Sequence, residues 1–212
     1  MVVLFLIRHG VNDWFDNRLA GWTPEVHLND EGIKQAECLV ERLAPVPFDA
    51  IYSSPLERTI ETAGPLAQAR GIDVNSTREL GEVDYGVWQG ASLKDLTKKK
   101  EWAVVRIAPS AMRFPDGESL REMQNRAVAA IERIALEHPK GTVAVFSHGD
   151  VIRAIVAHFI GMPLDLFHRL TISPASITVL TIGQFGARLL RLNDTGPFQP
   201  PSKNGRRRKR TK

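Results

Sequence analysis

Cysteine is almost absent from this chain of 212 residues, in which Cys38 is the only one. An internal disulfide and a zinc site built from several cysteines are therefore excluded, and the composition suits a reducing compartment. We expect Cys38 to be a packed thiol in the core, because its neighbours on a predicted helix are apolar.

Long hydrophobic runs are also missing. The first apolar segment, 2–7, is too short for a membrane span or a signal-peptide core, and no basic region precedes it. We therefore expect a cytoplasmic protein that does not enter a membrane. No His-Glu-x-x-His or comparable spacing of metal ligands occurs, so we expect neither a metal nor another cofactor.

Positive charge is concentrated at one end of the sequence. The formal net charge is +4, but seven lysines and arginines without an acid lie within 203–212, which leaves the remainder at −3. We predict one domain, 1–196, and a disordered basic tail, 197–212, which has too few apolar residues to fold. The tail could contact polyanions, whereas the domain lacks a basic stripe with aromatics and is not expected to bind nucleic acid. A monomer and a homodimer both remain open.

Apolar strand-like runs alternate with segments of helical periodicity, which is typical of α/β proteins. We predict a mostly parallel central sheet flanked by helices on both faces, with a C-terminal hairpin. The predicted strands are 2–7, 50–53, 142–147, 176–182 and 187–192, and the predicted helices are 31–44, 54–71, a long helix after Ser119 and one from about Val151.

Local signals mark where helices begin and break. Ser54-Pro55-Leu56-Glu57 predicts an N-cap serine with proline in the first helical position, and Pro65 predicts a kink or interruption of the same helix. Ser119 and Glu122 have the spacing of a second capping box. The segment 92–117 is the least regular part of the domain, so we expect it to form a lid or lobe.

Two histidines directly follow predicted strands. His9 follows the strand 2–7 after one intervening arginine, His148 follows the strand 142–147, and a glycine comes after each histidine. Ligands of open α/β sheets bind at the carboxyl ends of the strands, so we expect both imidazoles at one ligand site. Each glycine would let the backbone and the ligand approach closely.

An anion site is indicated next to these histidines. Arg8 precedes His9, and Arg58 lies near the start of the predicted helix 54–71. Planar guanidinium groups and a helix N-terminus favour phosphate. A carboxylate for proton transfer would come from Glu82 or Asp84, between which the residues themselves do not decide.

With these motifs the chain resembles the histidine phosphatase superfamily, which includes the cofactor-dependent phosphoglycerate mutases, over residues 2 to about 192. The motifs are Leu6-Ile7-Arg8-His9-Gly10, Ser53-Ser54-Pro55-Leu56-x-Arg58-Thr59-x-x-Thr62-Ala63, Leu80-x-Glu82-x-Asp84-Tyr85-Gly86-x-Trp88-x-Gly90, Pro115-Asp116-Gly117-Glu118-Ser119 and Ser147-His148-Gly149-x-Val151-Ile152-Arg153.

The resemblance implies the role of each residue in the predicted site. His9 would be the nucleophile that becomes phosphorylated, and Glu82 would be the proton donor. Arg8, Arg58 and a protonated His148 would hold the phosphoryl group, which agrees with the positive charge that phosphoryl transfer requires.

A proton donor near neutral pH needs a raised carboxyl pKa. We expect Tyr85 and Trp88 to supply an apolar environment that raises the pKa of Glu82.

Some positions depart from the family pattern. Phe15 stands where an asparagine is usual, so we expect Asn12 or Asn17 to provide that phosphate contact instead. Ala20 stands where the family usually has a glutamine. The resemblance places the next residue, Gly21, among the phosphate-binding residues.

Three functions remain open at this point. The leading hypothesis is a phosphomonoesterase acting on a small phosphorylated metabolite, because family mutases have a much longer insertion than the segment between Gly90 and Glu118. The alternative is a phosphoglycerate mutase-type phosphomutase, and the third is a non-catalytic phosphate-binding protein. We interpret His168, Trp102 and Arg106 as ordinary packed or solvated residues.

Overall fold

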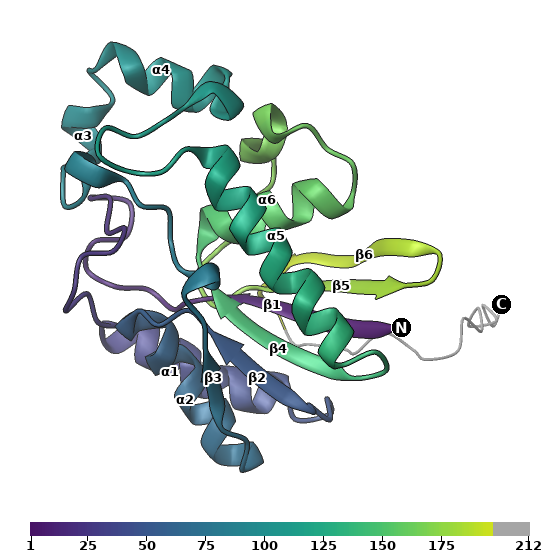
Figure 1. The fold of residues 1–212 in the computed structure, drawn as a ribbon. Helices are drawn as coiled ribbons and strands as arrows, with labels where there is room; N and C mark the ends of the chain where they lie inside the picture. Colours follow the sequence, from purple (N-terminus) through teal and green to yellow (C-terminus); the bar gives the residue numbers. More distant parts are fainter. Residues whose placement is uncertain (197–212) are drawn as a thin grey trace, which may run out of the picture.

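The computed structural model describes residues 1–196, and the predicted basic tail, 197–212, lies outside them. The strands are β1 (Val2–Arg8), β2 (Ala50–Ser53), β3 (Val74–Ser76), β4 (Thr142–Ser147), β5 (Ile177–Gly183) and β6 (Gly186–Asp194). They form one sheet in the order β3-β2-β4-β1-β5-β6 (Figure 1). The first four neighbours pair in parallel, whereas β5 and β6 form an antiparallel hairpin that pairs with β1. This arrangement confirms the predicted sheet and its C-terminal hairpin.

Helices cover both faces of the sheet (Figure 1). The helices α1 (Asp30–Arg42) and α2 (Glu57–Arg70) lie on one face, and α5 (Leu120–Glu137) and α6 (Gly149–Phe159) lie on the other. Alternate side chains of β1 point to opposite faces, so Phe5 joins the core under α1 and α2 whereas Leu6 joins the core under α5 and α6. Burial on both faces explains why the central strands are continuous apolar runs.

Cys38 corrects one expectation, because its side chain is exposed rather than packed in the core. The buried positions of α1 are Gly32, Ala36 and Leu39, which recur every three or four residues on one face. Cys38 is next to Leu39 in a helix of about 3.6 residues per turn, so it lies outside this face. The apolar neighbours of Cys38 were therefore a poor guide to its own burial.

The start of α2 also differs from its prediction. The helix begins at Glu57 with Leu56 as its N-cap, and no side chain caps it. Ser54 lies in the turn before the helix, where its Oγ accepts a hydrogen bond from the Leu56 N–H. The helix then continues to Arg70 without an interruption at Pro65. Gly64 precedes this proline and has no Cβ to clash with the ring, which removes part of the usual penalty.

The predicted lid is more regular than expected. It contains α3 (Leu93–Leu96), α4 (Lys100–Ile107) and a short 3-10 helix, Pro109–Ala111. Figure 1 shows α3 and α4 at the top of the molecule, away from the sheet. The segment returns to the body at α5, where Ser119 and Glu122 form the predicted capping box.

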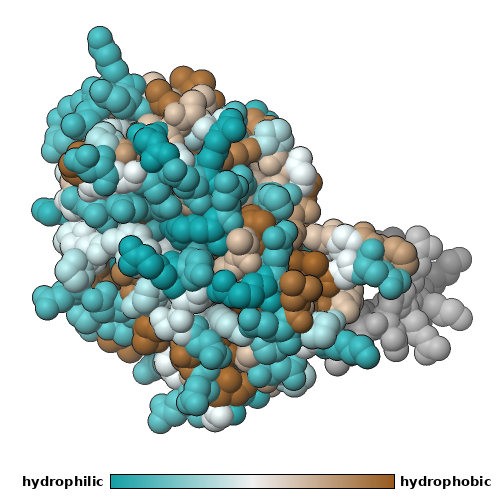
Figure 2. Space-filling view, viewed as in Figure 1, coloured by the Kyte–Doolittle hydropathy of each residue, from teal (hydrophilic) through white to brown (hydrophobic). Residues whose placement is uncertain are grey.

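The surface of the domain is mixed in character. On the face seen in Figure 2, hydrophilic residues cover most of the area and hydrophobic residues form small separate groups. Among residues 1–196, none of the helices combines the length and apolar character that crossing a membrane requires.

Candidate active site

The ends of β1 and β4 bring the two predicted histidines together. These strands are parallel neighbours, with Arg8 opposite Ser147 in the register. His9 and His148 follow these residues, and their ring centroids lie 5.2 Å apart. The prediction that the two imidazoles meet at the carboxyl edge of the sheet is confirmed.

His9 is a buried, neutral imidazole with a defined tautomer. Its Nδ1 is 2.7 Å from the carbonyl oxygen of Gly10, which can only accept, so Nδ1 carries the proton and Nε2 has a free lone pair. Burial lowers the pKa of His9 well below its usual range, and the positive charges of Arg58 and Arg8 lower it further. The ring therefore has an unprotonated nitrogen at neutral pH.

The glycines after both histidines lie at close contacts, one with backbone and one with a side chain. A Cβ on Gly10 would lie 2.8 Å from the carbonyl oxygen of Gly32, where the start of α1 packs against this loop. A Cβ on Gly149 would lie 3.2 Å from the guanidinium carbon of Arg8. Both positions therefore leave little room for any larger residue.

Two guanidinium groups face the histidines. Arg58, only 1% exposed, donates from Nη2 to the carbonyl oxygen of Gly21 at 2.8 Å and to Nδ1 of His148 at 3.3 Å. Arg8 donates from Nη1 to the carbonyl oxygen of Ile172 at 2.7 Å. The Nε of Arg8 and both Nε and Nη1 of Arg58 are buried without a hydrogen-bond partner.

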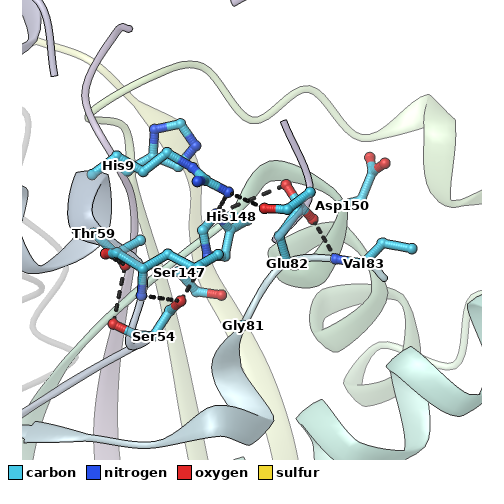
Figure 3. A network of polar contacts seen from close by, with 12 residues as sticks. His9, Ser54, Thr59, Gly81, Glu82, Val83, Ser147, His148 and Asp150 are labelled. Atoms are coloured by element: carbon cyan, nitrogen blue, oxygen red, sulfur yellow. Dashed lines mark hydrogen bonds and ion pairs between the residues drawn. The ribbon is translucent and has the colours of Figure 1, made fainter. Parts of the chain in front are cut away.

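His148 is completely buried, and the groups around it disfavour the protonated form that was expected. Burial lowers the pKa of His148 well below its usual range, and the charge of Arg58 is the next largest cause. Nδ1 accepts from Arg58, so the ring proton is on Nε2, which donates to Oγ of Ser54 at 2.8 Å (Figure 3). The motif in the sequence identifies His148, but only the structure shows that its ring is removed from solvent.

Glu82 lies on the other side of His148, with its Oε2 3.8 Å from Nδ1 of that ring (Figure 3). Burial raises the pKa of Glu82 to about 7, and the negative charge of Asp150 adds to the effect. Tyr85 lines the same cavity, as expected, whereas Trp88 is buried against Trp102 and does not line it. The raised carboxyl pKa is confirmed, with Asp150 as an additional cause.

The backbone around Glu82 is firmly held. Its carbonyl oxygen accepts from Nη2 of Arg126 at 2.8 Å and from Nε1 of Trp22 at 2.6 Å, while its Oε1 accepts from the Val83 N–H at 2.9 Å. Asp84, the other candidate carboxylate, accepts instead from the Gly86 N–H within its own loop and is outside the cavity lining.

A cavity of about 480 Å³ opens above these groups. Asn12 and Gly21 both line it, whereas Asn17 is exposed and does not. Phe15, at the position of the usual family asparagine, lies against Arg8 with the guanidinium carbon 5.0 Å from the ring centroid. Across residues 1–196, no three His, Cys, Asp or Glu side chains are grouped so that they could hold a metal ion.

Comparison with known proteins identifies the family. The model of the histidine phosphatase superfamily (branch 1) matches residues 4–195. The chain belongs to this superfamily. Phosphoserine phosphatase 1 of Hydrogenobacter thermophilus is 31% identical over 92% of this chain and 93% of the relative. The probable phosphoglycerate mutase GpmB of Salmonella arizonae is 32% identical over 84% of both chains. Among solved structures, Bacillus stearothermophilus YhfR superposes with a TM-score of 0.87 at 27% identity, over 94% of this chain and all of the other.

Two charged residues of this histidine phosphatase were missed by sequence reasoning as parts of the site. Asp150 and Arg153 line the cavity and pair with each other, at 2.6 Å between Oδ1 and Nη1. Tyr85 donates from its hydroxyl to Oδ2 of Asp150 at 3.3 Å. The signal was their i, i+3 spacing directly after His148, because the first turn of α6 begins at the same edge of the sheet.

The lid of the histidine phosphatase also contributes to the cavity. Trp102 and Arg106 of α4 line it, and so does His168, whose Nε2 lies 2.9 Å from the carbonyl oxygen of Val105. These three residues were not placed at the cavity by the sequence. Their proximity depends on contacts between α4 and the 3-10 helix Leu164–Arg169, which no local pattern reveals.

Proposed function

We propose that this histidine phosphatase is a phosphomonoesterase that hydrolyses a small phosphorylated metabolite through a phosphohistidine at His9. One observation carries the proposal: Arg8 and Arg58 line the same cavity as His9, and three of their guanidinium nitrogens are buried without a hydrogen-bond partner. A buried donor without a partner costs about 1–3 kcal/mol, and more when charged. Phosphoryl oxygens would satisfy such donors, because guanidinium groups match them in geometry and charge.

The proposed reaction has two displacements. Nε2 of His9 attacks phosphorus, the ester bond breaks, and the departing alkoxide takes the proton of Glu82. Glu82 then removes a proton from a water whose oxygen attacks the phosphohistidine, which breaks the P–N bond and releases inorganic phosphate. Arg8 and Arg58 would stabilise the charge on the phosphoryl oxygens in both steps.

Asn12 and Gly21 are proposed to complete the phosphate site. Oδ1 of Asn12 already accepts from the Trp14 N–H at 2.9 Å, so its Nδ2 remains available to donate to a phosphoryl oxygen. Gly21 would act by fixing Arg58 through its carbonyl oxygen. Asn17 is exposed, so we assign it no phosphate contact.

A phosphomutase is the alternative, and the similarity to a probable phosphoglycerate mutase supports it. In a mutase, the phosphohistidine would pass its phosphoryl group to a bound product instead of water. The length of the lid favours hydrolysis. In this chain the cavity is covered by a short segment that contains α3 and α4, whereas the mutases of the family share a longer insertion at this place. A purely phosphate-binding protein would leave the raised pKa of Glu82 without a use.

A substrate panel tests the proposal. Phosphorylated sugars, phosphoglycerates, phosphoserine and nucleotides are assayed for released phosphate with and without 2,3-bisphosphoglycerate. Phosphate release without the bisphosphate is the expected result. Isomerisation stimulated by the bisphosphate would select the mutase, and the absence of turnover on every compound would favour the binding protein.

Setting and assembly are part of the same proposal. We place the enzyme in the cytoplasm, as a monomer or homodimer whose domain, 1–196, does not bind nucleic acid. The support is the single cysteine and the acidic balance of the chain before the tail. Light scattering on the purified protein measures the oligomeric state directly.

A further inference from the structure

We infer that Ser54 is a positioning residue, which holds the His148 imidazole in one tautomer and turns Nδ1 toward the reaction site. Figure 3 shows Ser54 and Glu82 on opposite sides of this ring. The kinetic consequence of the inference rests on the proposed phosphatase function. The tautomer itself does not, and it can be measured without any substrate.

The contacts of His148 determine where its proton lies. The guanidinium of Arg58 can only donate, so the 3.3 Å contact from its Nη2 requires an unprotonated Nδ1. The single ring proton is then on Nε2, 2.8 Å from Oγ of Ser54, which accepts it. A flipped ring would direct an N–H at a guanidinium, which has no acceptor.

Ser54 is itself rigidly placed. Its backbone N–H donates to the carbonyl oxygen of Phe146 at 3.0 Å, and its carbonyl oxygen accepts from Oγ1 of Thr59 at 3.0 Å and from Oγ of Ser53 at 2.9 Å. The side chain is fully buried, and its Oγ also accepts from the Leu56 N–H. A hydroxyl held in this way restricts the rotation of the ring that it contacts.

The placement fits the charge changes expected during phosphoryl transfer. Nδ1 faces Arg58 and Glu82, with His9 and Arg8 nearby. A hydroxyl oxygen accepts from Nε2–H in the neutral imidazole and in the imidazolium alike. The contact with Ser54 therefore survives if a bound phosphoryl dianion draws a proton onto Nδ1, and the ring stays in place through both states.

The tautomer is tested by nitrogen NMR of the full chain labelled with 15N-histidine, in which the signals of His148 are assigned by their loss in His148→Ala. The wild type is expected to show one tautomer, protonated at Nε2. Ser54→Ala is expected to show averaging between tautomers or ring orientations. Ser147→Ala is the matched control, because it removes a neighbouring buried hydroxyl that donates to the carbonyl oxygen of Leu80 and does not hold Ser54.

The kinetic arm measures kcat and KM of the same variants. Ser54→Ala is expected to lower kcat on the order of 10- to 100-fold with little change in KM, because a displaced group near the reacting atoms acts mainly on the chemical step. Ser54→Cys keeps the size but accepts hydrogen bonds weakly, so it provides the same test if the alanine variant does not fold.

Two results would overturn the inference: a wild-type His148 protonated at Nδ1, or a Ser54 variant with the same single tautomer and unchanged kcat. If no compound of the substrate panel is turned over, the proposed function fails, and the NMR spectra still decide the role of Ser54.

Discussion

The floor of the cavity, formed by residues at the ends of β1 and β4, differs in structure from the lid above it, which contains α3 and α4. His9 and His148 are fixed at the ends of β1 and β4, and Arg58 is buried beside them. The lid helix α4 has eight residues, no side-chain cap and one buried side chain, Val105. Groups at the ends of buried strands keep their geometry, whereas short exposed helices are free to move and to vary. From this comparison we expect the floor to carry out the chemical step and the lid to select the substrate.

The largest effect is expected at Glu82. Glu82→Gln removes the proposed proton donor of the floor, so turnover of esters with poor leaving groups should fall by about 10²- to 10⁴-fold. Activated aryl phosphates need little proton donation and should lose less in phosphoenzyme formation, which rapid-quench kinetics measures. An equal loss on both substrate types would give Glu82 another role and would make Asp84 the next carboxylate to test.

The pH dependence should report the same carboxyl group. A general acid works in its protonated form, so a pKa of about 7 for Glu82 predicts that kcat/KM for an alkyl phosphate falls as the pH rises above about 7. Asp150→Asn removes a negative charge that raises this pKa, and should move the alkaline limb to lower pH. The substrate ionises in the same way in assays of the wild type and of Asp150→Asn, so a difference between their pH profiles comes from the protein. An unmoved limb would show that another group controls it.

A smaller effect is expected in the lid. Trp102→Ala removes a large side chain from the cavity wall, so KM should rise several-fold, with kcat changed by less than a factor of about three. Ile107→Ala is the control, because Ile107 lies on the same helix, is 77% exposed and does not line the cavity. A loss of kcat larger than that of the floor variants would reverse the comparison.

The smallest effect is expected outside both regions. Deletion of 203–212 should leave kcat/KM on a small substrate unchanged and lower the affinity for a polyanion such as heparin, because it removes seven positive charges. Turnover at fixed salt and retention on a heparin column measure the two quantities. A large loss of turnover would make the tail part of the site.

The same contrast explains how much the sequence could predict. The strands that carry His9 and His148 were predicted to within a residue, because their apolar runs reflect burial on both faces. The roles of Arg58 and Glu82 came from the family resemblance. The start of α2 was misplaced because Ser54 contacts His148, 94 residues away, instead of capping the helix. Contacts across such distances leave no local pattern.

Protonation was the least predictable property of the site. The sequence placed His148 correctly, but the lowering of its pKa comes from complete burial and from the neighbouring Arg58. His168 joins the cavity through the 3-10 helix Leu164–Arg169, which meets α6 only in the folded chain. The identity of charged residues can be read from motifs, whereas their desolvation and their partners require the structure.

The central claim is that Nε2 of His9 becomes phosphorylated. Rapid quenching with a labelled phosphomonoester should trap a phosphoenzyme that survives alkali and is lost in acid, because a phosphoramidate departs readily once its nitrogen is protonated. Peptide mapping should place the label on His9, and His9→Ala should abolish trapping while His148→Ala only weakens it. Substantial turnover by His9→Ala, or label on Ser53, Ser147 or Cys38, would contradict the account.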